Sequence, residues 1–235
     1  ASADGRYLSF TDWSTAGVDI RDLVTGENRR IKDTGGFARG QGEVWANSIS
    51  PDGKRVAFGY YHNWSRTAAK RQDSELHVIG ADGKGHRVLL SGKEIIYLEP
   101  YSWSPDGKWI SVVVEYPSET KIALISPDGG QARFIPMPDH VWRTKVTFSP
   151  DGNWLAYTKR RPGAPTAPAL CLTPANASSP SEVLLQENAT LMGWTPDGSG
   201  ILFSRERIGV HDLYLLPLSQ GRPSGEPRPV YASSD

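Results

Sequence analysis

The chain has 235 residues, and its 26 lysine and arginine residues balance 26 aspartate and glutamate residues, so the formal net charge is zero. A general polyanion-binding protein normally carries an excess of positive charge, which argues against a nucleic-acid-binding function. No apolar run approaches the ~18 residues that a membrane-spanning helix needs, and the lone Cys171 excludes an intrachain disulfide.

A short turn motif, here called the corner, recurs five times and organises the predicted elements. It reads Ser or Thr, one further residue, then Asp-Gly, and the further residue is proline in four copies. Proline presets the first central position of a type I turn and glycine takes the left-handed position, so we expect a three-residue hairpin with a glycine bulge. The spacing of 45 to 54 residues between successive corner aspartates suits four short strands with their turns. These aspartates are Asp4, Asp52, Asp106, Asp151 and Asp197.

Segments of alternating apolar residues flank the corners and continue into a second hairpin within each repeat. In chain order, the predicted strands cover residues 18–21 and 28–31; 45–49, 55–58, 76–79 and 87–90; 101–103, 109–112, 122–125 and 132–135; 145–148, 154–157, 169–172 and 183–185; and 213–216 and 228–230. The sequence Ser126-Pro127-Asp128-Gly129 copies the corner but lies at a second hairpin, so we do not count it as a repeat.

Four-stranded units repeated radially are typical of an all-β fold, the β-propeller. We predict about five four-stranded blades that form one domain over residues 1–235, with the first blade incomplete because it begins at its corner. The predicted blades cover residues 1–33, 43–91, 96–136, 142–186 and 189–232.

The two ends of the chain leave the closure of the ring open. The chain begins at Ala1 without an initiator methionine, so we interpret it as a processed chain or an excised piece. No strand remains to complete the first blade. We favour five blades of a larger propeller, and the alternative is a closing strand that lies outside this sequence.

The repeat pattern Ser/Thr-Pro-Asp-Gly-Lys/Arg-x-aliphatic-x-aromatic resembles the WD-like repeat of the TolB and tricorn-protease group of bacterial propellers. The resemblance covers essentially the whole chain, although the first copy has Ala3 in place of proline and the last continues with Ser199-Gly200. It implies the propeller fold and a periplasmic or otherwise extracytoplasmic location. It leaves the function open, because such propellers serve as receptors, scaffolds and accessory domains of enzymes.

Catalytic motifs are missing from the sequence, which has no Gly-x-Ser-x-Gly, His-Glu-x-x-His or phosphate-binding loop. We therefore predict that the chain is not an enzyme and needs no cofactor or metal. His77 and His211 lie at or beside third strands, which leaves a metal site as an alternative to their role as ordinary strand residues. The corner aspartates have a structural explanation, because turn aspartates accept hydrogen bonds from nearby backbone amides.

Irregular loops connect the second to the third strands and one blade to the next, and they gather on the face opposite the corners. These loops cover residues 33–44, 62–74, 136–143 and 159–168 and combine basic with aromatic residues. Arginine and tryptophan are enriched at interaction hot spots, and binding residues concentrate on loops carried by a rigid scaffold. We predict that this loop face binds an acidic or carboxylate-bearing protein, peptide or glycan. Its candidate binding residues are Arg39, Trp64, Arg66, Arg71, His140, Trp142, Arg143 and Arg160, and Lys159 belongs to the same loops.

The expected function is a non-catalytic module that binds a protein or ligand, with no nucleic acid as a partner and no membrane insertion by this segment. An alternative comes from the resemblance to prolyl-oligopeptidase and tricorn-type serine peptidases, whose propellers gate substrates for a separate catalytic domain. A third interpretation is the sensor domain of a bacterial membrane or regulatory protein.

Overall fold

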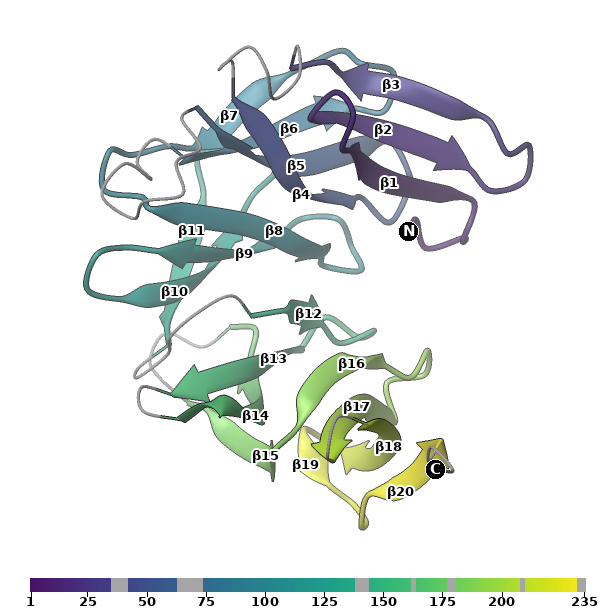
Figure 1. Cartoon of the computed structure of the whole chain (residues 1–235), viewed down its shortest axis with the longest axis vertical. Helices are drawn as coiled ribbons and strands as arrows, with labels where there is room; N and C mark the ends of the chain where they lie inside the picture. Colours follow the sequence, from purple (N-terminus) through teal and green to yellow (C-terminus); the bar gives the residue numbers. More distant parts are fainter. Residues whose placement is uncertain are drawn as a thin grey trace. The chain divides into compact units, whose positions relative to one another are not determined.

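Every regular element in the described part of the chain is a β-strand, and twenty strands form five antiparallel sheets (Figure 1). The all-β prediction is therefore confirmed. The computed structural model describes residues 1–34, 42–62, 74–137, 144–161, 164–176, 181–207 and 210–231.

The chain divides into two compact units, Ala1–Phe134 and Ile135–Asp235. The first three sheets belong to the first unit, although the last strand of the third sheet continues across the boundary. The remaining two sheets form the second unit. The predicted single domain over all 235 residues stays a prediction.

The first sheet has three strands, β1 (Tyr7–Asp12), β2 (Gly17–Asp22) and β3 (Asn28–Lys32). It begins directly after its corner, so the expected incomplete first blade is confirmed. The second sheet contains β4 (Glu43–Ile49), β5 (Arg55–Tyr61), β6 (Ser74–Gly80) and β7 (Arg87–Leu90). The third contains β8 (Tyr97–Trp103), β9 (Ile110–Glu115), β10 (Thr120–Ile125) and β11 (Ala132–Pro136).

The fourth sheet contains β12 (Val146–Phe148), β13 (Trp154–Arg161), β14 (Ala164–Pro174) and β15 (Val183–Glu187). The fifth contains β16 (Thr190–Trp194), β17 (Gly200–Arg207), β18 (Val210–Ser219), β19 (Arg222–Pro223) and β20 (Arg228–Tyr231). Both β19 and β20 pair with β18, so the outer position of this sheet is divided between two short strands.

Each corner is fixed by a serine or threonine hydroxyl, a role that was not predicted from the turn motif. In the second sheet, Ser50 donates its backbone N–H to the Arg55 carbonyl at 2.8 Å, and Gly53 donates to the Ser50 carbonyl at 2.9 Å. The Arg55 amide donates instead to Ser50 Oγ at 2.9 Å, and Ser50 Oγ donates to Asp52 Oδ1 at 2.6 Å. The loop therefore has four residues, 51–54, and the predicted three-residue hairpin is wrong by one. The Ser50 hydroxyl accepts the hydrogen bond of the Arg55 amide, which in a regular strand pair would go to the Ser50 carbonyl.

Apolar side chains from neighbouring sheets form the cores inside each unit. In the first unit, one core joins the first two sheets around Phe58, and another joins the second and third around Leu76 and Leu98. In the second unit, Leu172 and Phe203 belong to the core between its two sheets. All these side chains are fully buried.

The predicted irregular loop over residues 159–168 is wrong, because strands β13 and β14 extend into it. Lys159 pairs with Ala169 and Arg161 with Ala164, with an irregularity of register between the two pairs. Prolines are tolerated in this part of β14 because a proline lacks the backbone N–H but keeps its carbonyl as a hydrogen-bond acceptor. The carbonyl of Pro168 still accepts a hydrogen bond from the Ala189 amide at 2.9 Å.

Candidate functional site

The corner carboxylates accept hydrogen bonds from their own turns, as the sequence predicted. Asp52 Oδ1 accepts the hydroxyl of Ser50 and, at 3.0 Å, the Lys54 amide. The Ser50 hydrogen bond is the largest cause that lowers the pKa of Asp52. Hydrogen bonds from Thr195 and Ser199 lower the pKa of Asp197 to about 2. These carboxylates are therefore ionised at neutral pH and stand as fixed negative charges at the corner end of their sheets.

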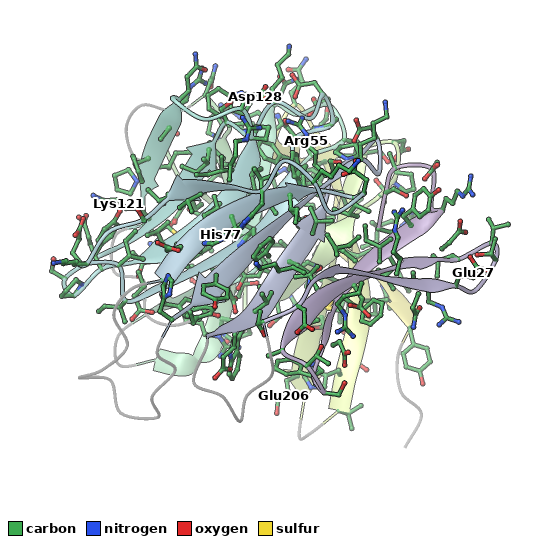
Figure 2. The ribbon with its side chains drawn as sticks, turned by 90° about the horizontal axis from the view of Figure 1, so that it is seen from above. Glu27, Arg55, His77, Lys121, Asp128 and Glu206 are labelled. Carbon is green, nitrogen blue, oxygen red and sulfur yellow. The ribbon has the colours of Figure 1, made fainter. Side chains whose placement is uncertain are left out.

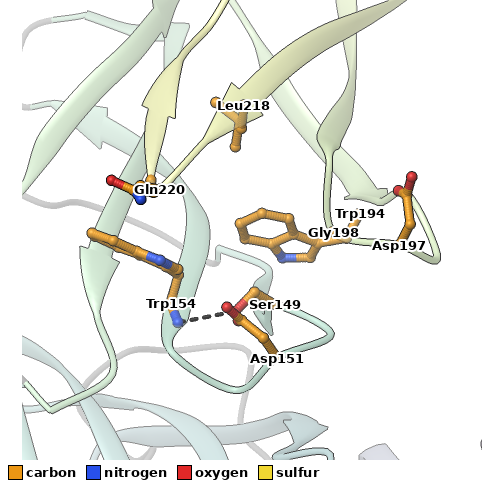
Figure 3. A pocket seen from close by; sticks show the side chains of 9 residues that line it. Ser149, Asp151, Trp154, Trp194, Asp197, Gly198, Leu218 and Gln220 are labelled. Atoms are coloured by element: carbon orange, nitrogen blue, oxygen red, sulfur yellow. Dashed lines mark hydrogen bonds between the residues drawn. The ribbon is translucent and has the colours of Figure 1, made fainter.

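A pocket lies between the corners of the fourth and fifth sheets in the second unit (Figure 3). The indole rings of Trp154 and Trp194 line it together with Leu218. The volume is about 100 Å³. We call this site the corner pocket, and its lining residues are Ser149, Asp151, Trp154, Trp194, Asp197, Gly198, Leu218, Gln220 and Gly221.

The two indole rings are held by the strands and turns that carry them. Trp154 is the first residue of β13, and its amide donates to Ser149 Oγ at 2.9 Å. Its ring lies against Gly221, where a Cβ atom would meet the ring carbon Cζ2 at 2.3 Å. Trp194 ends β16, and its Nε1 donates a long hydrogen bond of 3.5 Å to the Thr147 carbonyl. The walls of the pocket are therefore formed before any ligand arrives.

The lining of the corner pocket is aromatic and acidic. Small-molecule sites usually enclose roughly 300–1,000 Å³, so this pocket suits a single side chain better than a whole small molecule. The Ser149 hydroxyl is already engaged with Asp151 and with the Trp154 amide. The lining offers two aromatic surfaces and two carboxylates, and it contains no histidine, cysteine or lysine.

Most of the predicted loop-face residues lie outside the described residues. This applies to the following seven: Arg39, Trp64, Arg66, Arg71, His140, Trp142 and Arg143. Arg160 is described, and it is a partly buried residue of β13. The shared site of these eight residues therefore stays a prediction.

Lys159, predicted in the same loops, is buried in an ion pair. Its Nζ lies 3.0 Å from Glu182 Oε1, and its side chain is only 7% exposed. Tyr157 donates its hydroxyl to Glu182 Oε2 at 2.6 Å. Burial, followed by the contact with Glu182, raises the pKa of Tyr157 far above its ordinary value. These three side chains connect strand β13 to the segment before β15 and are not free to bind a partner.

A histidine cluster in the second sheet was not predicted. Glu75 Oε2 lies 2.8 Å from His62 Nε2 and 2.9 Å from His77 Nε2, and His77 Nδ1 lies 2.7 Å from His86 Nε2. Residues 75 and 77 lie on one side of β6, opposite Tyr60 and Phe58 of β5, which a period-two reading of both strands could have revealed. Within the described residues, no group of such side chains is arranged to hold a metal ion.

The fold is that of the TolB- and tricorn-type β-propellers, as the repeat predicted. TolB from Acinetobacter baumannii superimposes with a TM-score of 0.66 at 17% identity, over 94% of this chain and 54% of that chain. The β-propeller domain of the trilobed protease from Pyrococcus furiosus gives a TM-score of 0.56 at 14% identity, over 91% of this chain and 61% of that one.

In sequence, the chain is 27% identical to a probable dipeptidyl-aminopeptidase B of Podospora anserina over 169 residues. That match covers 65% of this chain but only 18% of the relative, so the chain spans a small part of it. No family model matches the chain. Among the described residues, no helix is long and apolar enough to cross a membrane.

Proposed function

We propose that the chain is a non-catalytic propeller module that captures a protein or peptide partner, and that the corner pocket receives one side chain of that partner. The observation that carries the proposal is the preformed pocket between Trp154 and Trp194. Tryptophan is enriched at interaction hot spots, where a side chain from one protein fills a well-packed pocket of the other. The likeness to TolB supports a periplasmic or otherwise extracytoplasmic location.

Selection of partner peptides tests this proposal and does not require the natural partner to be identified first. A random peptide library displayed on phage is selected on the wild-type chain and on a Trp154→Ala/Trp194→Ala variant. We expect peptides that bind the wild type and lose at least tenfold in affinity on the variant, because a hot-spot truncation costs about 2 kcal/mol or more. Trp109→Ala, at the equivalent position of the third sheet, is the matched control. Enriched peptides that bind all three proteins equally would refute the role of the pocket.

The loop face remains a second proposed contact surface, for an acidic or carboxylate-bearing partner. Charge reversal of Arg66, Arg71, Arg143 and Arg160 together should abolish capture of such a partner and leave the melting temperature nearly unchanged. Capture retained by the charge-reversed variant would remove the loop face from the proposal.

The alternative function is a propeller that gates substrates for a serine peptidase whose catalytic domain lies outside this chain. The sequence match to a probable dipeptidyl-aminopeptidase B and the likeness to the propeller domain of a protease favour it. The parent reading frame decides between the two functions. A downstream α/β-hydrolase segment with Gly-x-Ser-x-Gly supports gating, and its absence supports the binding module.

A further inference from the structure

We propose that the corner pocket accepts the guanidinium group of an arginine side chain from a peptide partner. This inference rests on the proposed function and names the chemistry of the group that the pocket takes. It follows from comparing the pocket with the equivalent place in the first unit, which the chain fills with a side chain of its own.

The equivalent place lies between the corners of the second and third sheets, and Arg55 occupies it. Arg55 follows Ser50 by five residues, as Trp154 follows Ser149, and Trp103 precedes Ser104 as Trp194 precedes Thr195. The guanidinium carbon of Arg55 lies 5.4 Å from the centre of the Trp103 ring. The chain therefore demonstrates that a guanidinium fits against the tryptophan at this position of the repeat.

Polar groups around Arg55 also accept hydrogen bonds from its guanidinium. Its Nη1 donates to Asp128 Oδ1 at 2.9 Å, and Figure 2 shows both residues at one end of the first unit. Its Nη2 donates a longer hydrogen bond of 3.5 Å to the Gly107 carbonyl. Gly107 is the corner glycine of the third sheet, and its equivalent in the fifth sheet, Gly198, lines the corner pocket. The glycine that supplies the carbonyl acceptor beside Arg55 therefore has its counterpart in the lining of the corner pocket.

Other corners of the first unit repeat the pairing of arginine with an aromatic ring. The guanidinium carbon of Arg133 lies 4.5 Å from the centre of the Trp109 ring, and that of Arg6 lies 5.0 Å from the centre of the Tyr7 ring. A cation over an aromatic face is attracted by the ring quadrupole, and tryptophan is the best partner. Among the described residues, no cation lies over Trp154 or Trp194. At the corner pocket, the chain supplies the rings and leaves the cation to a ligand.

The charge at the corner pocket has the sign that a guanidinium requires. Asp151 and Asp197 both line it. Burial opposes the ionisation of Asp151, but hydrogen bonds from Ser149 and Asn153 hold its pKa below the ordinary value. Both carboxylates are therefore anionic at neutral pH. They belong to the corners themselves, whereas Asp128, the carboxylate that binds Arg55, belongs to the second hairpin of the third sheet.

The test uses the tripeptide acetyl-Gly-Arg-Gly-amide and its citrulline counterpart, which keeps the shape of arginine and removes the charge. Both are titrated into the nitrogen-15-labelled chain, and the indole Nε1–H signals are followed by NMR. Trp154→Phe and Trp194→Phe variants assign the two pocket signals. We expect saturable shifts of these two signals with the arginine peptide and at least roughly tenfold weaker binding of citrulline, since the cation–π and carboxylate attractions are both lost. Equal binding of both peptides would overturn the inference.

A charge variant distinguishes attraction of the guanidinium by the two corner carboxylates from damage to the corner turns. Asp151→Asn/Asp197→Asn should weaken the arginine peptide several-fold and leave the citrulline peptide unchanged. The same double change at Asp52 and Asp106, in equivalent turns of the first unit, should leave both unchanged. If the phage selection instead yields peptides that depend on the pocket but lack basic residues, the proposed function stands and this inference is refuted. If no selected peptide depends on the pocket, the proposed function itself fails.

Discussion

At the scale of single residues, the corner hydroxyl explains why serine or threonine begins every copy of the repeat. Four corners use serine, and in the fifth Thr195 Oγ1 accepts the Gly200 amide at 2.9 Å in the same way. At the second corner, for example, the Ser50 hydroxyl accepts a hydrogen bond from the Arg55 amide and donates one to Asp52, so a single side chain makes both contacts. Sequence reasoning predicted the turn from proline, aspartate and glycine. It missed the hydroxyl because the usual turn rules assign that position no hydrogen bond across the loop.

Replacing a corner serine by alanine should therefore cost stability. Ser50 is 1% exposed, and Ser50→Ala leaves the Arg55 amide without its partner. We expect a loss of about 1–3 kcal/mol in the free energy of unfolding, as for a buried donor left unsatisfied. Urea unfolding measures it. Ser50→Thr should keep most of the stability, because threonine serves at the fifth corner, and a Ser50→Ala chain as stable as the wild type would contradict this role.

The corner aspartates predict a loss of stability in acid. Hydrogen bonds from Ser50 and from Ser104 are the largest causes that lower the pKa of Asp52 and of Asp106. A carboxyl whose pKa is lower in the folded state stabilises the fold above the unfolded pKa, and this contribution disappears as the pH falls through the folded value. Urea unfolding between pH 5 and pH 2 should show a smaller decline for Asp52→Asn/Asp106→Asn than for the wild type. An equal decline in both would contradict the assignment.

At the scale of elements, most strands were predictable and the ends of one hairpin were not. Alternating apolar residues beside each corner predicted β5, β9 and β13, and in the structure both sides of these strands are largely buried. The proline-rich segment at the start of β14 indicated a loop. Long hairpin arms continue there because residues such as Lys159 find an ion-pair partner in Glu182, a contact from 23 residues away. Local patterns contain no signal for such a contact.

The second sheet should respond to pH through its histidine cluster. Burial is the largest cause that lowers the pKa of His77, and the groups around it are Glu75, His62 and His86. Tyr60 packs on its ring, and Lys32 acts on His86. The folded chain therefore binds fewer protons than the unfolded chain below about pH 6.5, and the free energy of unfolding should decrease from pH 7 to pH 5.

A His77→Gln variant tests this response, because glutamine does not titrate. Chemical unfolding of both proteins at pH 7 and pH 5 should give a smaller decrease for the variant. His211→Gln, which changes an exposed histidine of β18, serves as the control for the removal of a histidine as such. A His77→Gln chain with an undiminished decrease would contradict the assignment.

At the scale of the whole molecule, the repeat predicted the class of fold, and the loop-face site that it suggested stays a prediction beside the proposed corner pocket. Residues five positions after the corner serine are Tyr7, Arg55, Trp109 and Trp154 in the first four repeats. Aligning these positions could have indicated that the second repeat supplies an arginine where the fourth supplies a ring. What a sequence does not reveal is that the hairpin at Gly221 lies against Trp154 and that an open pocket results.

One substitution tests the account most directly, because it fills the corner pocket as Arg55 fills the equivalent place. Trp154→Arg should place a guanidinium of the chain's own against Trp194. Calorimetric titration with an arginine-containing peptide selected on the wild type should then detect binding to the wild type and none to the variant, with Trp109→Arg as the control that still binds. Binding of the peptide to Trp154→Arg with unchanged affinity would contradict the account.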